Sequence, residues 1–126
     1  MNKFSFFDLR VYQESKALVK EVYKLLQKFP KYEVYALGDQ LRRSVISVPS
    51  NIAEGSARTD KDFAHFLSIA IGSLFELSTQ IILAERIGYI DHTQSLSLCD
   101  KADKLQMMIS GFMRRLEEGS SQPIVL

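Results

Sequence analysis

The sequence predicts an all-α fold, an up-down-up-down antiparallel four-helix bundle with a proline-kinked second helix, and three observations lead to it. Four segments carry apolar residues at spacings of three and four, which is the period of a helix face. Proline and glycine are scarce, at 3 and 6 of 126 residues, which argues against an all-β fold with many tight turns. The connections are short, which favours antiparallel neighbours. We therefore predict one domain over residues 1–126, with helices over about 8–29, 34–57, 60–87 and 92–118 and a flexible tail at 119–126.

The first predicted helix has one apolar face and one charged face. Asp8 is the expected N-cap, because its carboxylate can accept hydrogen bonds from the first free amides of the helix. Pro30 is expected to end the helix, since the residue before a proline is pushed out of the α region. The apolar face is formed by Leu18, Val22, Leu25, Leu26 and Phe29.

The second predicted helix contains a proline within its apolar stripe, in the stretch SVPSNIAEGSAR. Pro49 cannot donate to the carbonyl of Val45, which costs about 3 kcal/mol in a regular helix. Because the stripe continues to Ile52, we expect the helix to bend at Pro49 and not to end there. The bend either curves the helix around its neighbours or builds a small polar concavity for a ligand. The whole stripe is Leu37, Leu41, Val45, Val48 and Ile52.

The third predicted helix is apolar on more than one face. Thr59 and Asp62 form a capping-box variant at its start, and Gly88 is a suitable residue just after its end. A small four-helix domain has no fully central helix, so a second apolar face indicates a subunit interface, with contacts from the second and third helices. One stripe consists of Leu74, Leu77, Ile81 and Ala84, and the other of Ile71, Phe75, Ser78 and Ile82.

Glu76 is the only formal charge between Phe63 and Ala84. This segment is long enough to span a bilayer, but its serines, its glutamine and Glu76 would be costly in lipid, so no membrane association is expected. A buried carboxylate needs a partner, and we predict that Glu76 is at least half buried and pairs with Arg43. The predicted structural polar cluster consists of Arg43, Asn51, Glu54 and Glu76.

The fourth predicted helix carries a bundle seam. It begins near Asp91 or Thr93, and Gly119 is expected to end it. Its apolar positions alternate by four and three residues, as in helices that pack along their whole length. They are Leu98, Ala102, Leu105, Ile109, Phe112 and Leu116.

Composition indicates a protein of a reducing cytoplasm. The net charge is +1, there is one cysteine, and the first ten residues carry no long apolar core or small-residue cleavage site. No cofactor, metal site or catalytic residue is predicted, and we do not expect an enzyme. Asp62 and His65 make a single D-x-x-H pair, Cys99 is most simply a small core side chain, and no phosphate-binding glycine loop is present.

Basic residues form small clusters along the chain. The simplest interpretation is a solvated surface that keeps the protein soluble. The alternative is an RNA or anion contact that gains strength when an oligomer repeats it. The candidate contacts are Arg42, Arg58, Lys61, Arg114 and Arg115.

Three stretches carry a resemblance to a known family: FFDLRVYQES, FPKYEVYALGDQLRRSVISVPSNIAEG and FLSIAIGSLFELSTQIILAERIGYI. Over about Phe6 to Leu116 the chain resembles the 23S ribosomal RNA intervening-sequence proteins, also called the four-helix-bundle protein family. The resemblance implies a bacterial, cytoplasmic bundle that assembles into a ring, a homopentamer. The family is also similar in fold to a strongly basic protein of diversity-generating retroelements that binds nucleic acid, from which this nearly neutral chain differs in charge.

Three functions are carried forward from the sequence. The first is a non-enzymatic homo-oligomer that binds RNA or a ribonucleoprotein partner. The second is a protein–protein scaffold or adaptor without nucleic-acid binding. The third is a small-molecule binder that uses a polar pocket near Pro49 and Glu76, with Asn51 and Glu54 beside it.

Overall fold

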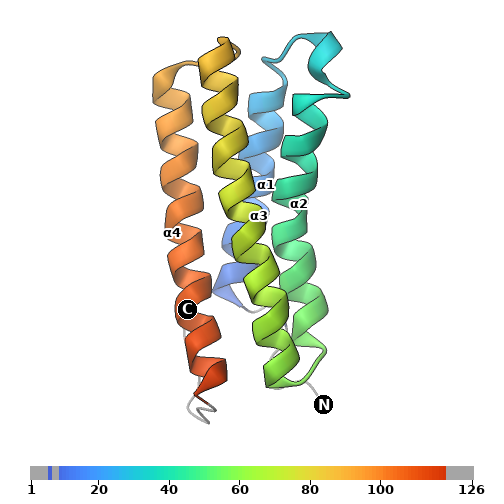
Figure 1. The fold of residues 1–126 in the computed structure, drawn as a ribbon, viewed down its shortest axis with the longest axis vertical. Coiled ribbons are helices and arrows are strands. Elements are labelled where there is room, and N and C mark those ends of the chain that lie inside the picture. The colour runs from blue at the N-terminus through green and yellow to red at the C-terminus, as the bar shows by residue number, and fades with distance from the viewer. Residues whose placement is uncertain (1–5, 7–8, 119–126) are drawn as a thin grey trace.

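The four helices run alternately up and down and form the predicted all-α bundle (Figure 1). They appear in a computed structural model that describes residue 6 and residues 9–118. Each helix packs against its neighbour in the chain, and the first closes the bundle against the fourth. The elements are α1 (Arg10–Leu26), the 3-10 turn η2 (Lys31–Glu33), α2 (Leu37–Ser56), α3 (Asp60–Ile87) and α4 (His92–Glu117).

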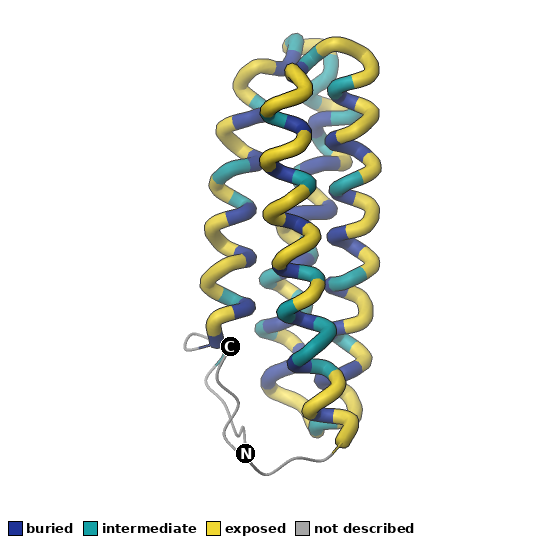
Figure 2. Tube along the Cα trace, turned by 90° about the vertical axis from the view of Figure 1, so that its left-hand side faces the viewer, coloured by how far each residue is buried: buried dark blue, intermediate teal, exposed yellow. Residues whose placement is uncertain are grey.

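The core lies along the axis of the bundle, and each helix contributes a stripe of buried residues to it. Figure 2 shows these stripes as dark bands that recur along every helix on its inward side. Phe63 of α3 and Phe112 of α4 meet edge to face with ring centroids 5.2 Å apart. The predicted stripes of the second and fourth helices are buried throughout, apart from the half-buried Leu37, as are four of the five predicted residues of the first. Burial of these apolar side chains is the main source of stability.

The connection between α1 and α2 is longer than predicted. The chain leaves α1 at Leu26, three residues before the predicted end, and tightens into a turn before Pro30. The helix α2 begins at Leu37, after η2, and its first amide donates to the Glu33 carboxylate at 3.2 Å. Glu33 also accepts from the Tyr89 hydroxyl at 2.9 Å, so it joins this connection to the turn after α3. The predicted N-cap Asp8, the predicted stop Gly119 and the predicted flexible tail lie outside the described residues.

The helix α2 continues through Pro49, as the stripe predicted. Polar side chains cluster next to the proline and bond to one another. The Asn51 amide donates to the Ser47 carbonyl at 2.8 Å and to its hydroxyl at 2.9 Å. The Ser73 hydroxyl of α3 donates to the same Ser47 hydroxyl at 2.8 Å, which links the two helices at the level of the proline.

The ends of α3 and the start of α4 follow the sequence signals. Thr59 caps α3 by accepting from the Asp62 amide at 3.3 Å. Gly88 stops it in the left-handed region with φ 101°, and the amides of Gly88 and Tyr89 bond back to the last turn of α3. Asp91 caps α4 in a full capping box with Gln94.

We expect Asp91→Ala to lower the free energy of unfolding by about 1 kcal/mol, because it removes an N-cap side chain. The Asp91 carboxylate accepts from the Gln94 amide at 2.8 Å. Asp91→Asn is the matched control, since asparagine caps about as well as aspartate. Urea denaturation measures both variants. An equal loss in both would contradict the hydrogen-bond explanation and assign the effect to the negative charge at the helix start.

The helix α3 is long and apolar enough to cross a membrane on length and composition alone. The same helix supplies a core stripe that packs against α2 and α4, and it buries Ser73 and Gln80 within the protein. Its composition therefore has an explanation that needs no membrane. Its outward side nevertheless keeps several exposed apolar residues, which become important below.

Candidate functional site

Four of the five candidate RNA contacts gather at one end of the bundle. Arg58 follows the end of α2 and Lys61 lies in the first turn of α3, while Arg114 and Arg115 lie in the last turn of α4. These helix ends meet because the bundle is antiparallel (Figure 1). A hollow of about 410 Å³ separates the start of α3 from the end of α4 and is lined by Lys61, Ala64, His65, Ser68, Met113, Leu116 and Glu117. We call this region the basic end, defined by Arg58, Lys61, Arg114 and Arg115.

The four side chains of the basic end differ in whether they already have a partner in the protein. Arg58 forms an ion pair with Glu54 and lies over the Phe66 ring, 5.3 Å from its centroid. The Glu54 hydrogen bond raises the pKa of Arg58, so this guanidinium stays charged. Lys61, Arg114 and Arg115 are exposed and form no ion pair with any described residue. Three cations at this end thus have no carboxylate partner within the part of the chain that the structure describes.

Arg42 lies at the opposite end of the bundle from this group. It occupies the first turns of α2, and its guanidinium donates to the Val34 carbonyl at 2.6 Å and to Asp39 at 3.3 Å. Arg42 therefore ties the connection before α2 to the helix itself. The five predicted contacts therefore do not form one surface. Arg42 lies near the start of α2, whereas the other four lie at the end of the bundle where α2 finishes.

The predicted polar cluster around Glu76 does not form. Glu76 lies on the exposed side of α3 and forms no ion pair with Arg43, so the predicted pairing is wrong. Arg43 donates from Nε to Asp39 at 2.8 Å, four residues earlier on α2, and this hydrogen bond lowers the pKa of Asp39. Asn51 bonds to Ser47, and Glu54 pairs with Arg58. Partners one helix turn away on α2 occupy Arg43, Asn51 and Glu54, because those partners are already in place without any ordering of a second helix.

Arg43 and Glu76 do share a polar furrow between α2 and α3, although they form no ion pair. We call it the serine furrow, and it is lined by Gln40, Arg43, Ser44, Ser47, Ser73, Glu76 and Gln80. The sequence argument missed Gln80, which follows Ser73 by seven residues and Glu76 by four on the same face of α3. That polar spacing within an apolar helix was the signal that would have identified it.

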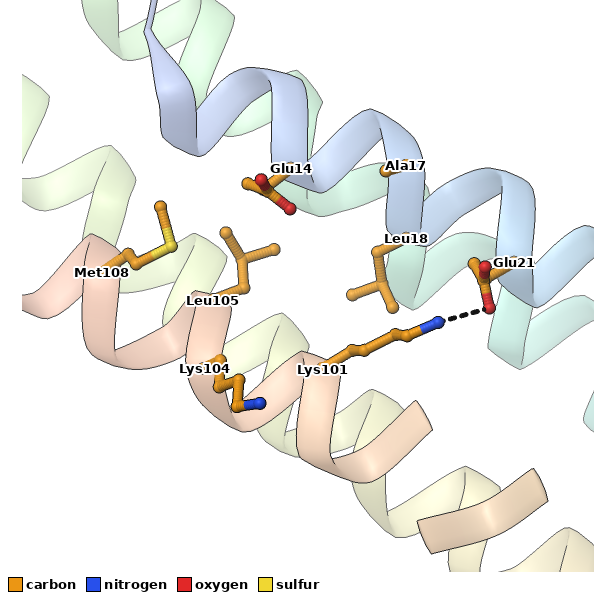
Figure 3. A pocket seen from close by; sticks show the side chains of 8 residues that line it. All are labelled: Glu14, Ala17, Leu18, Glu21, Lys101, Lys104, Leu105 and Met108. Atoms are coloured by element: carbon orange, nitrogen blue, oxygen red, sulfur yellow. Dashed lines mark hydrogen bonds and ion pairs between the residues drawn. The ribbon is translucent and has the colours of Figure 1, made fainter. Parts of the chain in front are cut away.

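A second hollow, of about 200 Å³, lies between α1 and α4 (Figure 3). Leu18, Leu105 and Met108 form its apolar part, and Lys101 reaches across to Glu21 at 2.9 Å. Lys104 pairs with Asp100 at 3.0 Å on its own helix. Both lysines that line this hollow therefore already form ion pairs, and the Lys101–Glu21 pair joins α4 to α1.

Groups suited to covalent or metal chemistry are not assembled in the part of the chain that the structure describes. No cluster of three or more histidine, cysteine, aspartate or glutamate side chains is placed to hold a metal ion among residues 6 and 9–118. Cys99 is half buried and its thiol donates to the Ser78 carbonyl at 3.8 Å. Burial raises the pKa of Cys99, so the thiol stays protonated and is a weak nucleophile.

The outward side of α3 exposes large apolar side chains. Phe75 is 59% exposed and Ile82 is 55% exposed, and they lie seven residues apart on one side of the helix. Ile69 and Leu83 lie seven residues before and after Glu76, and so share the side that borders the serine furrow. Apolar patches on an otherwise charged surface are typical of protein–protein contacts. The second apolar face that the sequence predicted is therefore present.

The fold, the serine furrow and the outward side of α3 together define a four-helix-bundle protein with an exposed apolar helix face and a polar furrow. The chain belongs to the family described as 23S rRNA-intervening sequence protein, which matches residues 7–111. It is also similar to the crystal structure of a protein with unknown function from the S23 ribosomal protein family of Bacteroides thetaiotaomicron VPI-5482. The two share 22% sequence identity with a TM-score of 0.74, over 82% of this chain and 98% of that one. No curated protein matches the chain.

Proposed function

We propose that this protein is a non-enzymatic, self-associating helical bundle of the bacterial cytoplasm that binds RNA or a ribonucleoprotein partner. One observation carries the proposal: the bundle leaves Phe75, Ile82, Leu83 and Ile87 of α3 exposed. A second copy that covers these side chains would remove their apolar surface from water, which is the main driving force of stable association.

The two sides of α3 support a ring in particular. Phe75 and Ile82 flank Ser78, whose carbonyl meets Cys99 of α4, so they lie toward α4. Ile69 and Leu83 lie on the other side, toward α2. Two different apolar surfaces on one subunit suit head-to-tail contacts, which close into a ring when the rotation between copies allows it. The family resemblance implies that such a ring has five copies.

The basic end is the part of the surface best suited to RNA. Lys61, Arg114 and Arg115 are exposed there without an ion pair to a described residue. A ring would place one such group per subunit on the same face, and several weak phosphate contacts would add through avidity. Asp60, Asp62 and Glu117 lie among these cations, so a single subunit should bind RNA weakly.

Sedimentation with a fluorescent pool of single-stranded RNA tests this function. The protein should sediment as an oligomer and carry RNA with it. If each subunit contacts about three phosphates, raising salt from about 50 to about 200 mM should weaken RNA binding about 20-fold per subunit. An Arg114→Ser/Arg115→Ser variant should lose most of the binding. The matched control is Lys20→Ser/Lys24→Ser, which removes the same charge from the exposed face of α1.

Two results would contradict the proposal. One is an equal loss of affinity in both double variants, which would reflect net charge alone and contradict RNA binding at the basic end. The other is an oligomer that carries no RNA at either salt concentration. That second result would favour the scaffold function, which the near-neutral net charge of +1 and the acidic residues of the basic end also support.

A further inference from the structure

The serine furrow contains the one buried polar side-chain atom, among the described residues, that has no hydrogen-bond partner. It is the carboxamide oxygen Oε1 of Gln80, a residue that is 8% exposed. A buried acceptor without a donor has lost its water and gained nothing in return, which is unfavourable. Gln80 lines a furrow of about 290 Å³, so a ligand bound in the furrow is the nearest source of a donor for this oxygen.

The other polar groups of the furrow show which kind of group is missing. Ser47 and Ser73 are bonded to each other at 2.8 Å. Arg43 uses its Nε for Asp39 and forms no ion pair with Glu76. Glu76 lies one turn before Gln80, is exposed, and forms no ion pair with any described residue. The two unmatched groups are therefore a carboxylate and a neutral acceptor at positions i and i+4 of one helix, which are surface neighbours.

We propose that the serine furrow binds an organic cation with N–H donors, a guanidinium or a primary ammonium, held between the carboxylate of Glu76 and the carboxamide oxygen of Gln80. The terminal torsion of glutamine is broad, so the carboxamide can turn its oxygen toward an entering donor without leaving its rotamer. Charge-assisted hydrogen bonds to the carboxylate are the strong contacts of such a site.

The same residues limit the ligand to a single positive charge. Arg43 lies across the furrow from Glu76 and would repel a second cation. An anion is disfavoured by the unpaired carboxylate of Glu76. Free amines carry the required group, and so do lysine and arginine side chains of a second copy of this chain. The inference does not rest on RNA binding.

The side-chain NH₂ signals of Gln80 report on this site directly. The experiment titrates ¹⁵N-labelled protein with methylguanidinium chloride and, separately, with tetramethylammonium chloride, which has the same charge but no N–H donor. We expect the Gln80 signals to shift in a saturable way with methylguanidinium and not with tetramethylammonium. Putrescine, a dication, should bind at least several-fold more weakly than methylguanidinium.

Two variants locate the binding. Glu76→Gln should weaken methylguanidinium binding at least about 10-fold, whereas Glu54→Gln, an exposed carboxylate outside the furrow, should leave it unchanged. Gln80→Leu should also weaken binding, and it should raise the melting temperature of the free protein because the unmatched acceptor is gone. This second readout does not depend on a ligand.

Protein concentration separates the two sources of the cation. If Gln80 signals shift on dilution of the wild-type protein and stay unchanged on dilution of Glu76→Gln, the group comes from a second copy, which supports the site. An equal dilution shift in both proteins reports only the apolar contact beside the furrow and counts against a cation from a second copy. If they shift only with added methylguanidinium, a small molecule is the ligand, which also supports it. Equal shifts with tetramethylammonium, or no shift with methylguanidinium at about 100 mM and none on dilution, would overturn the proposal.

Discussion

Lysine at both Phe75 and Ile82 should dissociate the proposed oligomer at micromolar concentration and leave the subunit folded. Both side chains are more than half exposed in the bundle, so their replacement costs the monomer little. In an interface, each lysine would replace a buried apolar contact with a charge that has no partner. Two apolar anchor residues of an interface are typically worth about 2 kcal/mol each, and about 2.7 kcal/mol already corresponds to a 100-fold weaker association.

The matched control for this experiment carries the same two charges on another helix. Leu96 and Met107 of α4 are 60% and 63% exposed, so Leu96→Lys/Met107→Lys changes net charge and apolar exposure equally. Analytical ultracentrifugation over a range of concentrations measures association, and circular dichroism verifies folding. If the α4 variant dissociates and the α3 variant does not, the contacts lie on α4, and the role proposed for α3 is refuted.

Alanine at Gly55 should lower the free energy of unfolding by about 1 kcal/mol. A Cβ atom there would lie 2.7 Å from Cδ1 of Phe63 and 2.8 Å from Cβ of Phe66. Phe63 has little room to move, because it is 2% exposed and packs against Phe112. Overpacking of this kind costs about 1–3 kcal/mol, which exceeds the gain of about 1 kcal/mol from replacing a helical glycine.

Gly72 provides the control, because a Cβ atom there would meet nothing within 4 Å. Gly72→Ala should therefore stabilise the protein by up to about 1 kcal/mol through helix propensity alone. Urea denaturation should be measured in the Phe75→Lys/Ile82→Lys background, so that association does not add to stability. Stabilisation by alanine at both positions would show that Phe63 and Phe66 move aside freely, contrary to the expected tight crossing of α2 and α3.

The contacts of Gly55 explain part of the role of the stretch SVPSNIAEGSAR. The sequence placed a proline and a glycine six residues apart in an otherwise regular helix pattern. The proline is accommodated beside a small polar network of Ser47, Asn51 and Ser73. The glycine allows the end of α2 to approach the start of α3. Both effects depend on α3, which the stretch itself does not contain.

The candidate site was predictable only in part. The positions of Arg58, Lys61, Arg114 and Arg115 follow from an antiparallel bundle, because the end of α2, the start of α3 and the end of α4 must then meet. The pairing of Glu76 with Arg43 was wrong, since a nearer partner on the same helix, Asp39, was available to Arg43. The apolar neighbours of Glu76 in the sequence also do not share its side of α3, since Leu74 and Leu77 are buried in the core while Glu76 lies on the exposed side.

The sequence by itself determined four helices, their core stripes and three of their ends, at Thr59, Gly88 and Asp91. These features depend on spacing and on hydrogen bonds within one or two turns, so residues close together in the sequence determine them. Only the tertiary structure decided which side of α3 faces outward and which polar groups share the furrow with α2. Spacing shows which residues lie on one face of a helix, but the packing of the other helices decides which of its faces is covered.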